Sequence, residues 1–262
     1  MKILSQATLD RIESPLMRRF ELHEEIASTQ ERARELALSG AQHGTLVVSR
    51  VQTGGRGRHG RNWGSPAGGI WMSLVLRLPL KAEHTPRITQ AAAVGVAKAL
   101  HDIGVGARIK WPNDLLVEGG KICGILAAGM PYTISGASER GSGFVTLGIG
   151  LNANLDPRDL DVPDGEVATI RSVLGHDIDQ TQLLETLLSH LDYEFGRIGH
   201  FENILSDWRK LNCTLGERVR IHKTDGAFGG VAIDITPQGA LILDTGEKKI
   251  ELFEGEVEHL RL

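Results

Sequence analysis

Apolar residues recur along the chain with two different spacings, and these spacings predict strands interleaved with helices. Alternating positions and short apolar runs predict strands, whereas spacings of three and four predict amphipathic helices. The predicted strands are residues 20–26, 45–49, 70–78, 108–111, 115–117, 121–130 and 144–151. The predicted helices are residues 4–12, a segment that begins after Ser28, residues 87–103 and 183–196, and a segment around Phe201, Leu205 and Trp208.

About fifty residues at the C-terminus follow a different pattern. Short stretches of period-two alternation begin near Asn212 and are broken by Asp225-Gly226, by Pro237-Gln238-Gly239 and by Thr245-Gly246. Frequent turns between short strands are typical of a small β-barrel. We therefore expect a boundary near residue 211, with one domain at 1–211 and a second at 212–262.

Composition excludes several broad classes of protein. Hydrophobic residues occupy 41% of the 262 positions, which is enough for a packed core and too many for a disordered chain. The net charge of −4 leaves no overall nucleic-acid footprint, so any positively charged site must be local. No stretch approaches the roughly 18 apolar residues of a membrane span, and no signal peptide opens the chain. We expect a cytoplasmic protein that does not enter membranes.

The most distinctive stretch is the Arg/Gly loop, Arg50–Trp63, which holds four arginines, four glycines and no acidic residue. Its glycines disfavour a stable helix or strand, and its like charges repel, so we expect it to become ordered around an anion. Backbone N–H groups near glycine and forked guanidinium donors suit phosphate. Arg/Gly runs also occur in solvated loops and in RNA-binding tails. The strands predicted on both sides favour a phosphate-binding loop over a tail.

Two further clusters carry candidate chemistry. Ser28 and Thr29 open a helix that Gly40 closes, and capping and ligand contact are equally compatible with them. Lys110 ends a predicted strand, and a hairpin turning at Gly119-Gly120 is expected to bring it near Asp114 and Lys121. Two lysines and nearby arginines suit a nucleoside triphosphate and its leaving pyrophosphate. Asp114 suits Mg²⁺ bound against those phosphates.

Other reaction classes lack support in the sequence. The chain contains no G-x-x-x-x-G-K-[ST] motif, and no serine or cysteine stands in a recognisable nucleophile elbow. Cys123 and Cys213 are single and far apart, which fits neither a disulfide framework nor a zinc knuckle. Cys123 lies inside an apolar run and is expected to be buried rather than reactive.

Four motifs, taken in order, resemble those of biotin–protein ligases. They are GRGRHGR at 55–61, KWPNDLL at 110–116, KICGIL at 121–126 and GIGLNAN at 148–154. Their order and spacing are similar to that family across most of residues 20–262, including a C-terminal segment that ends in EGEVEHLRL. A single one of these motifs is a weak signal, whereas four in the same order are a specific one.

The resemblance implies both a fold and a reaction. The fold is α+β, with a mixed, largely antiparallel sheet and flanking helices of the class II aminoacyl-tRNA synthetase type, followed by a small SH3-like barrel. In the reaction, biotin and ATP give biotinyl-5′-AMP and pyrophosphate, with Mg²⁺ at the phosphates. The biotinyl group then passes to a lysine of a biotin carboxyl carrier protein or domain.

The same resemblance assigns roles to individual residues. The catalytic residues are Lys121, Arg58 and Asp114, of which Asp114 is also the candidate Mg²⁺ ligand. The biotin contacts are Ser28, Thr29, Gln52, Gly55, Arg56, Arg58, Lys121 and Gly124. The ATP and adenylate contacts are Arg56, Gly57, Arg58, Arg61, Trp63, Lys110, Asn113, Asp114, Lys121 and Asn152. Trp63 is a candidate for stacking on adenine and equally for simple packing.

The chain departs from the family pattern in two places. Gln30 stands where the family commonly has Asn after the Ser-Thr pair, so no family role is carried over to position 30. The first motif begins at Ser28, too early for the winged helix-turn-helix and linker of the repressor-type members, so we expect no DNA binding. The sequence leaves open whether the protein is a monomer or a homodimer, and which carrier protein is the acceptor.

Two other functions remain as alternatives. Lipoate or octanoate transfer uses a related fold, but an aliphatic ligand does not need the neutral polar set around Ser28 and Thr29. RNA binding through the Arg/Gly loop and the small barrel predicts an affinity that falls steeply with salt. The acidic isoelectric point of about 6.2 and a single basic loop without interleaved aromatic residues argue against it.

Overall fold

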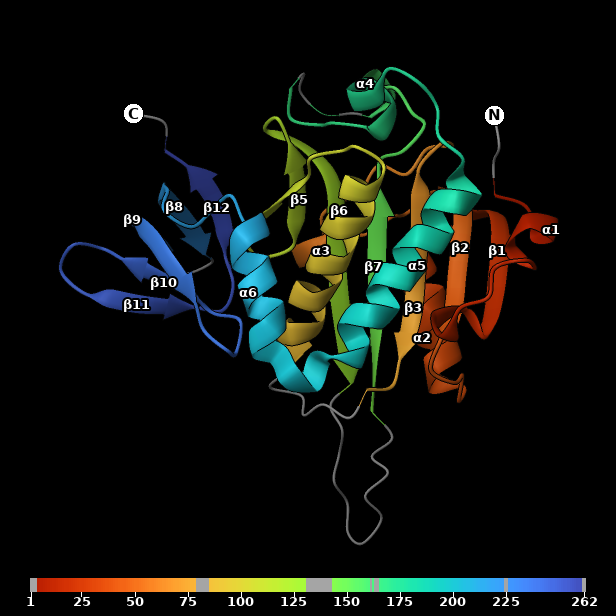
Figure 1. Ribbon diagram of the computed structural model, residues 1–262, viewed down its shortest axis with the longest axis horizontal. Coiled ribbons are helices and arrows are strands. Elements are labelled where there is room, and N and C mark those ends of the chain that lie inside the picture. The colour runs from red at the N-terminus through yellow and green to blue at the C-terminus, as the bar shows by residue number, and fades with distance from the viewer. Residues whose placement is uncertain are drawn as a thin grey trace, which may run out of the picture.

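The structure, a computed structural model, describes residues 4–78, 85–130, 143–160, 162, 165–223 and 226–260. Its main feature is a seven-stranded sheet in the order β1-β2-β3-β7-β6-β5-β4 (Figure 1). The strands are β1 (Arg19–Ile26), β2 (Thr45–Gln52), β3 (Ile70–Leu76), β4 (Arg108–Lys110), β5 (Asp114–Val117), β6 (Gly120–Met130) and β7 (Phe144–Leu151). Only the β1–β2 pair is parallel and the other five pairs are antiparallel, which confirms the mixed sheet of the α+β prediction.

Helices cover both faces of this sheet. The long helices α3 (Thr85–Asp102), α5 (Gln180–Gly196) and α6 (Phe201–Leu211) lie together over one face, in front of the strands in Figure 1. Helix α2 (Thr29–Leu38) packs against β2, β3 and β7 on the opposite face. The remaining helical turns are α1 (Gln6–Leu9), η1 (Pro15–Met17), η2 (Arg58–Gly60), η4 (Pro157–Asp159), α4 (Ile170–Leu174) and η5 (Ile198–His200).

Strand β3 shows how alternation sorts the two faces. Its even-numbered apolar residues belong to the large core beneath α3, α5 and α6. Val75 packs with α2 on the other face, and Ser73 also points away from the large core, toward Thr29 at the start of α2. Every residue of this strand is buried, because helices cover both of its faces. The sheet face that carries α2 is therefore the one available for a polar site.

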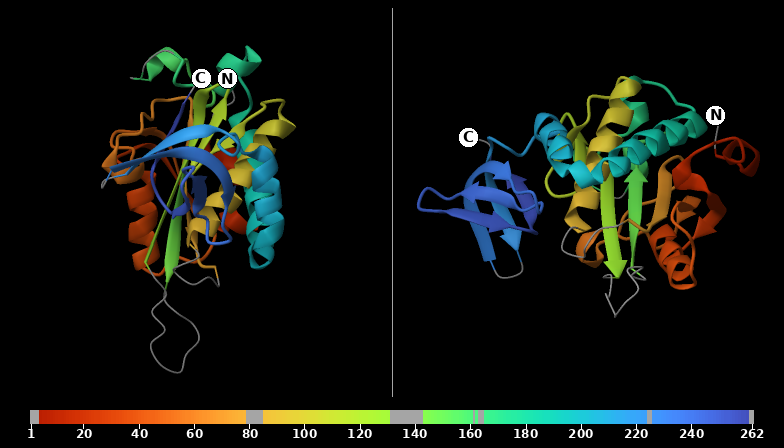
Figure 2. Two further views of the ribbon diagram at one scale, coloured as in Figure 1. Left: turned by 90° about the vertical axis from the view of Figure 1, so that its left-hand side faces the viewer. Right: turned by 60° about the horizontal axis from the view of Figure 1, so that its bottom comes forward.

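The C-terminal segment forms a separate five-stranded antiparallel sheet in the order β11-β10-β9-β8-β12. Its strands are β8 (Arg218–Lys223), β9 (Gly226–Ile235), β10 (Leu241–Asp244), β11 (Lys249–Leu252) and β12 (Glu256–His259). The two views of Figure 2 show this sheet standing beside the larger body. Asn212 pairs with Ile109 of the edge strand β4, and its side-chain amide donates to the Ile109 carbonyl at 2.9 Å. The connecting segment therefore covers the β4 edge of the main sheet. The domain boundary near residue 211 stays a prediction.

Most predicted elements form, with some differences in extent. Helix 4–12 was too long, because Ser5 caps a helix that ends at Leu9, although Leu4, Leu9 and Ile12 are buried as expected. Strand 70–78 ends at Leu76, and the helix predicted from residue 87 begins at Thr85. The polar turn predicted at 135–142 lies outside the described residues. Among the described helices, none combines the length and hydropathy that crossing a bilayer requires.

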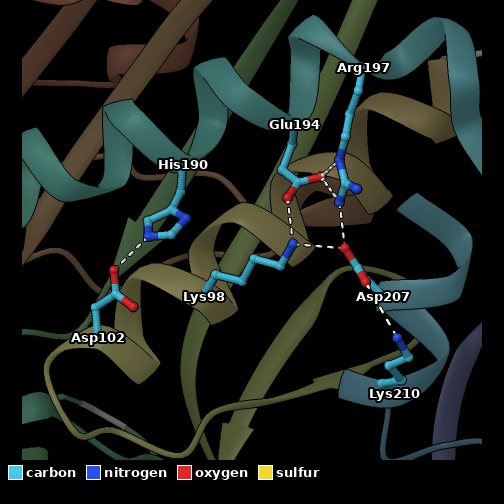
Figure 3. Close-up of polar contacts among 7 residues, drawn as sticks. All are labelled: Lys98, Asp102, His190, Glu194, Arg197, Asp207 and Lys210. Atoms are coloured by element: carbon cyan, nitrogen blue, oxygen red, sulfur yellow. Dashed lines mark hydrogen bonds and ion pairs between the residues drawn. The ribbon is translucent and has the colours of Figure 1, made fainter. Parts of the chain in front are cut away.

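A cluster of charged side chains joins α3, α5 and α6 (Figure 3). Glu194, whose side chain is fully buried, accepts from Lys98 Nζ at 2.9 Å and from Arg197 Nε at 2.8 Å. Asp207 also bonds both cations, with Lys98 Nζ at 2.8 Å. Burial acts to raise the pKa of Asp207, but its hydrogen bonds to Lys98 and Arg197 outweigh burial and lower the pKa. The cluster ties three helices together with no unpaired carboxylate among these residues.

Replacing Lys98 by Met should destabilise the protein by about 2 kcal/mol, because Glu194 would stay buried with one cation instead of two. Urea unfolding at pH 7 measures this. Because the pKa of Asp207 is lowered on folding, its charge stabilises the protein above its unfolded pKa of about 4, and that contribution is lost as pH falls further. The penalty should therefore shrink at acidic pH. Lys210→Met, which removes an exposed cation 3.9 Å from Asp207, should cost less than about 0.5 kcal/mol. Equal penalties for the two variants would contradict this account.

Candidate functional site

A cavity of about 180 Å³ opens on the α2 side of the main sheet, next to the C-terminal sheet. It is lined by the start of α2, the Arg/Gly loop, residues of β3 and β7, the β4–β5–β6 region and the turn that leads into β12. The predicted site residues that line it are Ser28, Thr29, Gln52, Arg56, Gly57, Arg58, Arg61, Trp63, Lys110, Asn113, Asp114, Lys121 and Gly124. The structure therefore brings together three clusters that are far apart in sequence.

Two predicted site residues lie elsewhere. Gly55 and Asn152 do not line this first cavity but a second one of about 600 Å³ beside it. Trp63 and Lys121 line both cavities. The two spaces thus meet along five side chains, which are Gln52, Arg61, Asn62, Trp63 and Lys121.

A β-bulge sets the direction of Lys121. In the β5–β6 pair, Leu115 stands opposite Cys123 and Leu116 opposite Lys121, which leaves Ile122 as an extra residue. Ile122 and Cys123 are consecutive, yet both are fully buried in the large core. The bulge therefore lets two successive apolar residues face the helices and turns Lys121 toward the cavity.

Lys121 is held there by an anion and an aromatic ring. Its Nζ lies 2.8 Å from a carboxylate oxygen of Asp114, and both side chains are more than two-thirds buried. The same Nζ lies 4.9 Å from the centre of the Trp63 ring, within the range of a cation–π contact. The ammonium group is thus fixed at the junction of the two cavities.

Trp63 rests on a glycine surface of the sheet. A Cβ atom at Gly150 would lie 2.4 Å from Trp63 Nε1, and one at Gly124 would lie 2.9 Å from the ring. Gly124 and Gly150 are paired across β6 and β7, so the absence of two neighbouring side chains makes room for the indole. Trp63 Nε1 is buried and has no hydrogen-bond partner among the described residues.

Neutral polar side chains line the far end of the first cavity. Ser28 caps α2, because its Oγ accepts from Glu31 N, and this confirms the predicted helix start. Thr29 donates from its backbone N and its Oγ1 to Gln52 Oε1 at 2.9 and 3.0 Å. Thr29 Oγ1 also contacts Ser73 Oγ at 2.9 Å, and because Thr29 spends its proton on Gln52, Ser73 is the donor. These four side chains offer hydrogen-bonding groups and carry no charge themselves.

Two side-chain amides nearby each keep one unused acceptor. Asn152 donates through Nδ2 to the carbonyls of Lys121 and Ala168, both at 3.1 Å, which fixes its orientation. Its buried Oδ1 has no partner among the described residues. Gln30 donates to Leu126 and Thr146, and its Oε1 lies against the Cα side of Gly148. Gln30, for which no role was predicted, thus braces β6 and β7 and also lines the cavity.

Two arginines of the Arg/Gly loop contact the turn between β4 and β5 and the C-terminal segment. Arg58 NH1 donates at 3.2 Å to Asn113 Oδ1 and to the carbonyl of Gly255 in the C-terminal sheet. Arg61 forms a two-fold ion pair with Glu256, with NH1 to Oε1 at 2.7 Å. Burial lowers the pKa of Arg58, whereas hydrogen bonding to Arg61 lowers the pKa of Glu256 against the opposing effect of burial. The loop is therefore joined to the C-terminal sheet by two arginines.

Parts of the loop differ from the sequence-based expectation. Arg50 belongs to β2 and points away from the cavity, where it bonds the carbonyl of Leu4 and the carboxylate of Glu24. The rest of the loop forms a narrow hairpin with isolated bridges between Gln52 and Ser65 and between Arg56 and Asn62. The loop was expected to become ordered around an anion. In the structure its Arg61 pairs with the carboxylate of Glu256, which the sequence alone did not reveal.

The residues present fit a magnesium ion only together with phosphate. No group of three or more His, Cys, Asp or Glu side chains suited to a metal occurs among the described residues. Asp114 offers one carboxylate beside the cavity, and Mg²⁺ is often bound by one or two carboxylates plus phosphate oxygens. Cys123 is fully buried, and burial raises the pKa of its thiol, so the prediction that it is buried rather than reactive is confirmed.

Sequence reasoning missed Glu256, Gly255, Ser65 and Ser73 as parts of the site. Ser73 lies within an apolar strand, where a lone serine at an alternate position was the only signal. Ser65 follows Trp63 by two residues in the N-W-G-S-P run. The two C-terminal residues carried no local signal, since their role depends on how the second sheet lies against the first.

Two protein-family models match parts of the chain. The profile described as "Biotin/lipoate A/B protein ligase family" matches residues 22–139, and the one described as "Biotin protein ligase C terminal domain" matches residues 214–260. The chain is 35% identical to the "Bifunctional ligase/repressor BirA" of Bacillus subtilis over 241 residues, which cover 90% of this chain and 72% of that protein. The chain belongs to the biotin–protein ligase family.

Other members of the family agree in sequence and fold. The chain is 34% identical to the "Biotin--[acetyl-CoA-carboxylase] ligase" of Mycobacterium tuberculosis over 86% of this chain and 83% of that protein. The biotin protein ligase of Aquifex aeolicus, solved in complex with biotin and ATP, superimposes with a TM-score of 0.77. That match has 25% identity and covers 94% of this chain and 100% of the other. The fold expected from the resemblance, including the SH3-like C-terminal sheet, is thereby confirmed.

Weakening the contact between the loop and the C-terminal sheet should expose the loop arginines. We expect Glu256→Gln to raise the rate of tryptic cleavage within residues 53–63 by about two- to fivefold, the value of an exposed ion pair. Mass analysis of fragments during limited digestion of the ligand-free protein measures this rate. Glu258→Gln is the matched control, since Glu258 lies on the same strand but pairs with His222 and Arg220 instead. Equal cleavage of both variants would show that the Arg61–Glu256 pair does not hold the loop.

Proposed function

We infer that the protein is a biotin–protein ligase, which activates biotin with ATP to biotinyl-5′-AMP and transfers the biotinyl group to a protein lysine. The observation that carries this inference is a single cavity with a neutral polar end at Thr29 and Gln52 and a cationic end at Lys121. Such a cavity suits a ligand that is uncharged at one end and carries a carboxylate at the other. Family membership and the similarity to a ligase solved with biotin and ATP support the same conclusion.

We propose that the neutral end binds the ureido ring of biotin. Thr29 Oγ1 donates to Gln52 and accepts from Ser73, so it keeps one lone pair for a ligand N–H. Gln52 Nε2 uses one hydrogen on Ser65 and keeps the second for a ligand carbonyl. A ureido group has both an N–H donor and a C=O acceptor. The two available positions therefore complement it without placing a charge against a neutral ring.

We propose that the cationic end brings two anions together. A biotin carboxylate oxygen must attack the α-phosphorus of ATP, forming a C–O–P anhydride while the bond to pyrophosphate breaks. Lys121 stands at the junction of the two cavities and can bind both the carboxylate and the phosphate, which lowers their mutual repulsion. Arg56, Arg58 and Arg61 supply further charge from the loop, and Gly57 keeps its backbone close to the ligand. Asn113 and Lys110 complete the phosphate side.

Asp114 would hold Mg²⁺ together with the phosphate oxygens, and the ion would supply charge neutralisation to the leaving pyrophosphate. The carboxylate of Asp114 pairs with Lys121 at 2.8 Å in the ligand-free protein. Binding of the triphosphate therefore requires this ion pair to be shared or exchanged.

We propose that adenine occupies the second cavity. The orphan Oδ1 of Asn152 provides one acceptor there, which suits the exocyclic amino group of adenine. Trp63 lines the same space and presents an aromatic face for stacking. Gly55 lines this cavity rather than the biotin end, so we reassign it from a biotin contact to the nucleotide side.

For transfer, the acceptor amine attacks the acyl carbon, the bond to AMP breaks, and the amine loses a proton. A lysine with a pKa near 10.4 is protonated at neutral pH, so the site must favour its neutral form. We propose that Asp114 orients this amine and accepts its proton. The family implies a biotin-carrying protein as the acceptor, and we propose a biotin carboxyl carrier domain.

The direct test is incubation with biotin, ATP, Mg²⁺ and a biotin carboxyl carrier domain, followed by mass measurement of the carrier. We expect the carrier to gain one biotinyl group on a single lysine. ATP–pyrophosphate exchange should depend on biotin and not on lipoate. Exchange with lipoate alone would contradict the proposal in favour of a lipoate ligase.

Replacing Lys121 by Ala should lower biotin-dependent exchange by at least about a hundredfold, because one charged group that serves both reacting anions is lost. The initial rate of pyrophosphate exchange measures this. Lys210→Ala, on the exposed side of α6, should leave the rate unchanged. Near-normal exchange in Lys121→Ala would remove this lysine from the reaction.

Replacing Arg58 by Gly should release biotinyl-5′-AMP before transfer. Arg58 joins the loop to Asn113 and to the C-terminal sheet, so its loss opens the path to solvent. We expect biotinyl-AMP to accumulate in the medium and bystander proteins to be biotinylated, as detected by streptavidin blotting. Wild-type retention of the intermediate would contradict this role.

A further inference from the structure

A directional chain of hydrogen bonds leads from the neutral end of the cavity to Trp63. Ser73 donates to Thr29, Thr29 donates to Gln52 Oε1, and Gln52 Nε2 donates to Ser65 Oγ at 2.8 Å. Since Ser65 accepts from an amide N–H, its own proton goes to the backbone carbonyl of Trp63 at 3.0 Å. Every donor in this chain points toward Trp63. Such chains are cooperative, so a change at one end affects the strength of the others.

The backbone around Ser65 leaves little space for another arrangement. Ser65 is 4% exposed, and its carbonyl accepts from Gln52 N at 3.0 Å. Trp63 N donates to the carbonyl of Gly55 at 2.9 Å. A Cβ atom on Gly55 would lie 2.5 Å from the Trp63 carbonyl and 2.7 Å from Ser65 Oγ. The Ser65 hydroxyl is thus enclosed between Gln52 and the backbone of Trp63.

The indole at the end of this chain lies where the two cavities meet. Trp63 lines both of them and lies on the glycine surface of Gly124 and Gly150. Its ring also contacts Lys121 Nζ. A shift of the Trp63 backbone would therefore change both the shape of the second cavity and the surroundings of the lysine.

We propose that Ser65 is a positioning residue that couples occupation of the ureido end to the placement of Trp63, and so to nucleotide binding. This rests on the proposed function, in which biotin occupies the first cavity and ATP the second. A ureido group that bonds to Thr29 and Gln52 alters the amide that donates to Ser65. Ser65 lines the second cavity but is only 4% exposed, and its hydroxyl donates to the Trp63 carbonyl, so it transmits the change through that bond.

The test is Ser65→Ala, assayed by biotin-dependent pyrophosphate exchange. We expect the KM for ATP at saturating biotin to rise about fivefold, the effect of one hydrogen bond, while the Kd for biotin measured without ATP changes less than twofold. Ser73→Ala is the matched control, because it removes a hydroxyl from the opposite end of the same chain. That variant should weaken biotin binding even without ATP, because Ser73 bonds directly to Thr29 at the ureido end.

A double-mutant cycle with Trp63→Ala separates coupling from general damage. If Ser65 acts through the indole, Ser65→Ala should produce no further rise in the KM for ATP once the ring is absent. Additive effects in the double variant would overturn the proposal, and so would an equal loss of biotin affinity measured without ATP for Ser65→Ala. Thermal midpoints of all variants identify loss of folding, and an additional Ser65→Cys variant, which keeps a weak donor, should restore part of the ATP affinity.

Failure of the proposed function gives a different result. In that case the wild-type protein would show no biotin-dependent exchange at all. Failure of the coupling alone leaves wild-type exchange intact, and Ser65→Ala then keeps the wild-type KM for ATP at saturating biotin.

Discussion

The site depends on keeping several positive charges close together before any substrate arrives. Lys121 is paired with Asp114, Arg61 with Glu256, and Arg56 lies 3.6 Å from Glu31. Each carboxylate comes from a different element, so the cations are neutralised only when the whole chain is folded. Substrate phosphates must then compete with protein carboxylates, which makes the charge of the empty cavity tolerable and the binding of an anion reversible.

Much of the fold follows from local patterns. The alternation in β3 and the leucine spacing of α5 predict which faces are buried, and the turn residues after Asn212 predict the second sheet. The Ser28 cap and the end of α2 near Gly40 follow from ordinary helix chemistry. The clusters around Thr29, Arg58 and Lys121 were assigned to one site by the resemblance to the family, and Lys121 was expected near Lys110 because a hairpin joins their strands.

What could not be predicted depends on contacts between distant segments. Nothing near Glu256 indicates that it pairs with Arg61, since the two are brought together only by the placement of the second sheet. Gly124 and Gly150 look like ordinary strand glycines until they are seen beneath one indole. Asn152 was expected beside the nucleotide. That its amide nitrogen bonds two backbone carbonyls while its oxygen stays unpaired could be learned only from the structure.

The extra residue in β6 has a consequence for how the family can vary. A strand that carried strict alternation through 121–125 would turn the ammonium group into the leucine layer beneath α3 and α5. Loss or gain of one residue between Lys121 and Gly124 would therefore move the Lys121 side chain from the cavity into the core, because successive strand residues face opposite sides of the sheet. We expect length changes to accumulate elsewhere in the chain, while the count of residues in this short segment is kept.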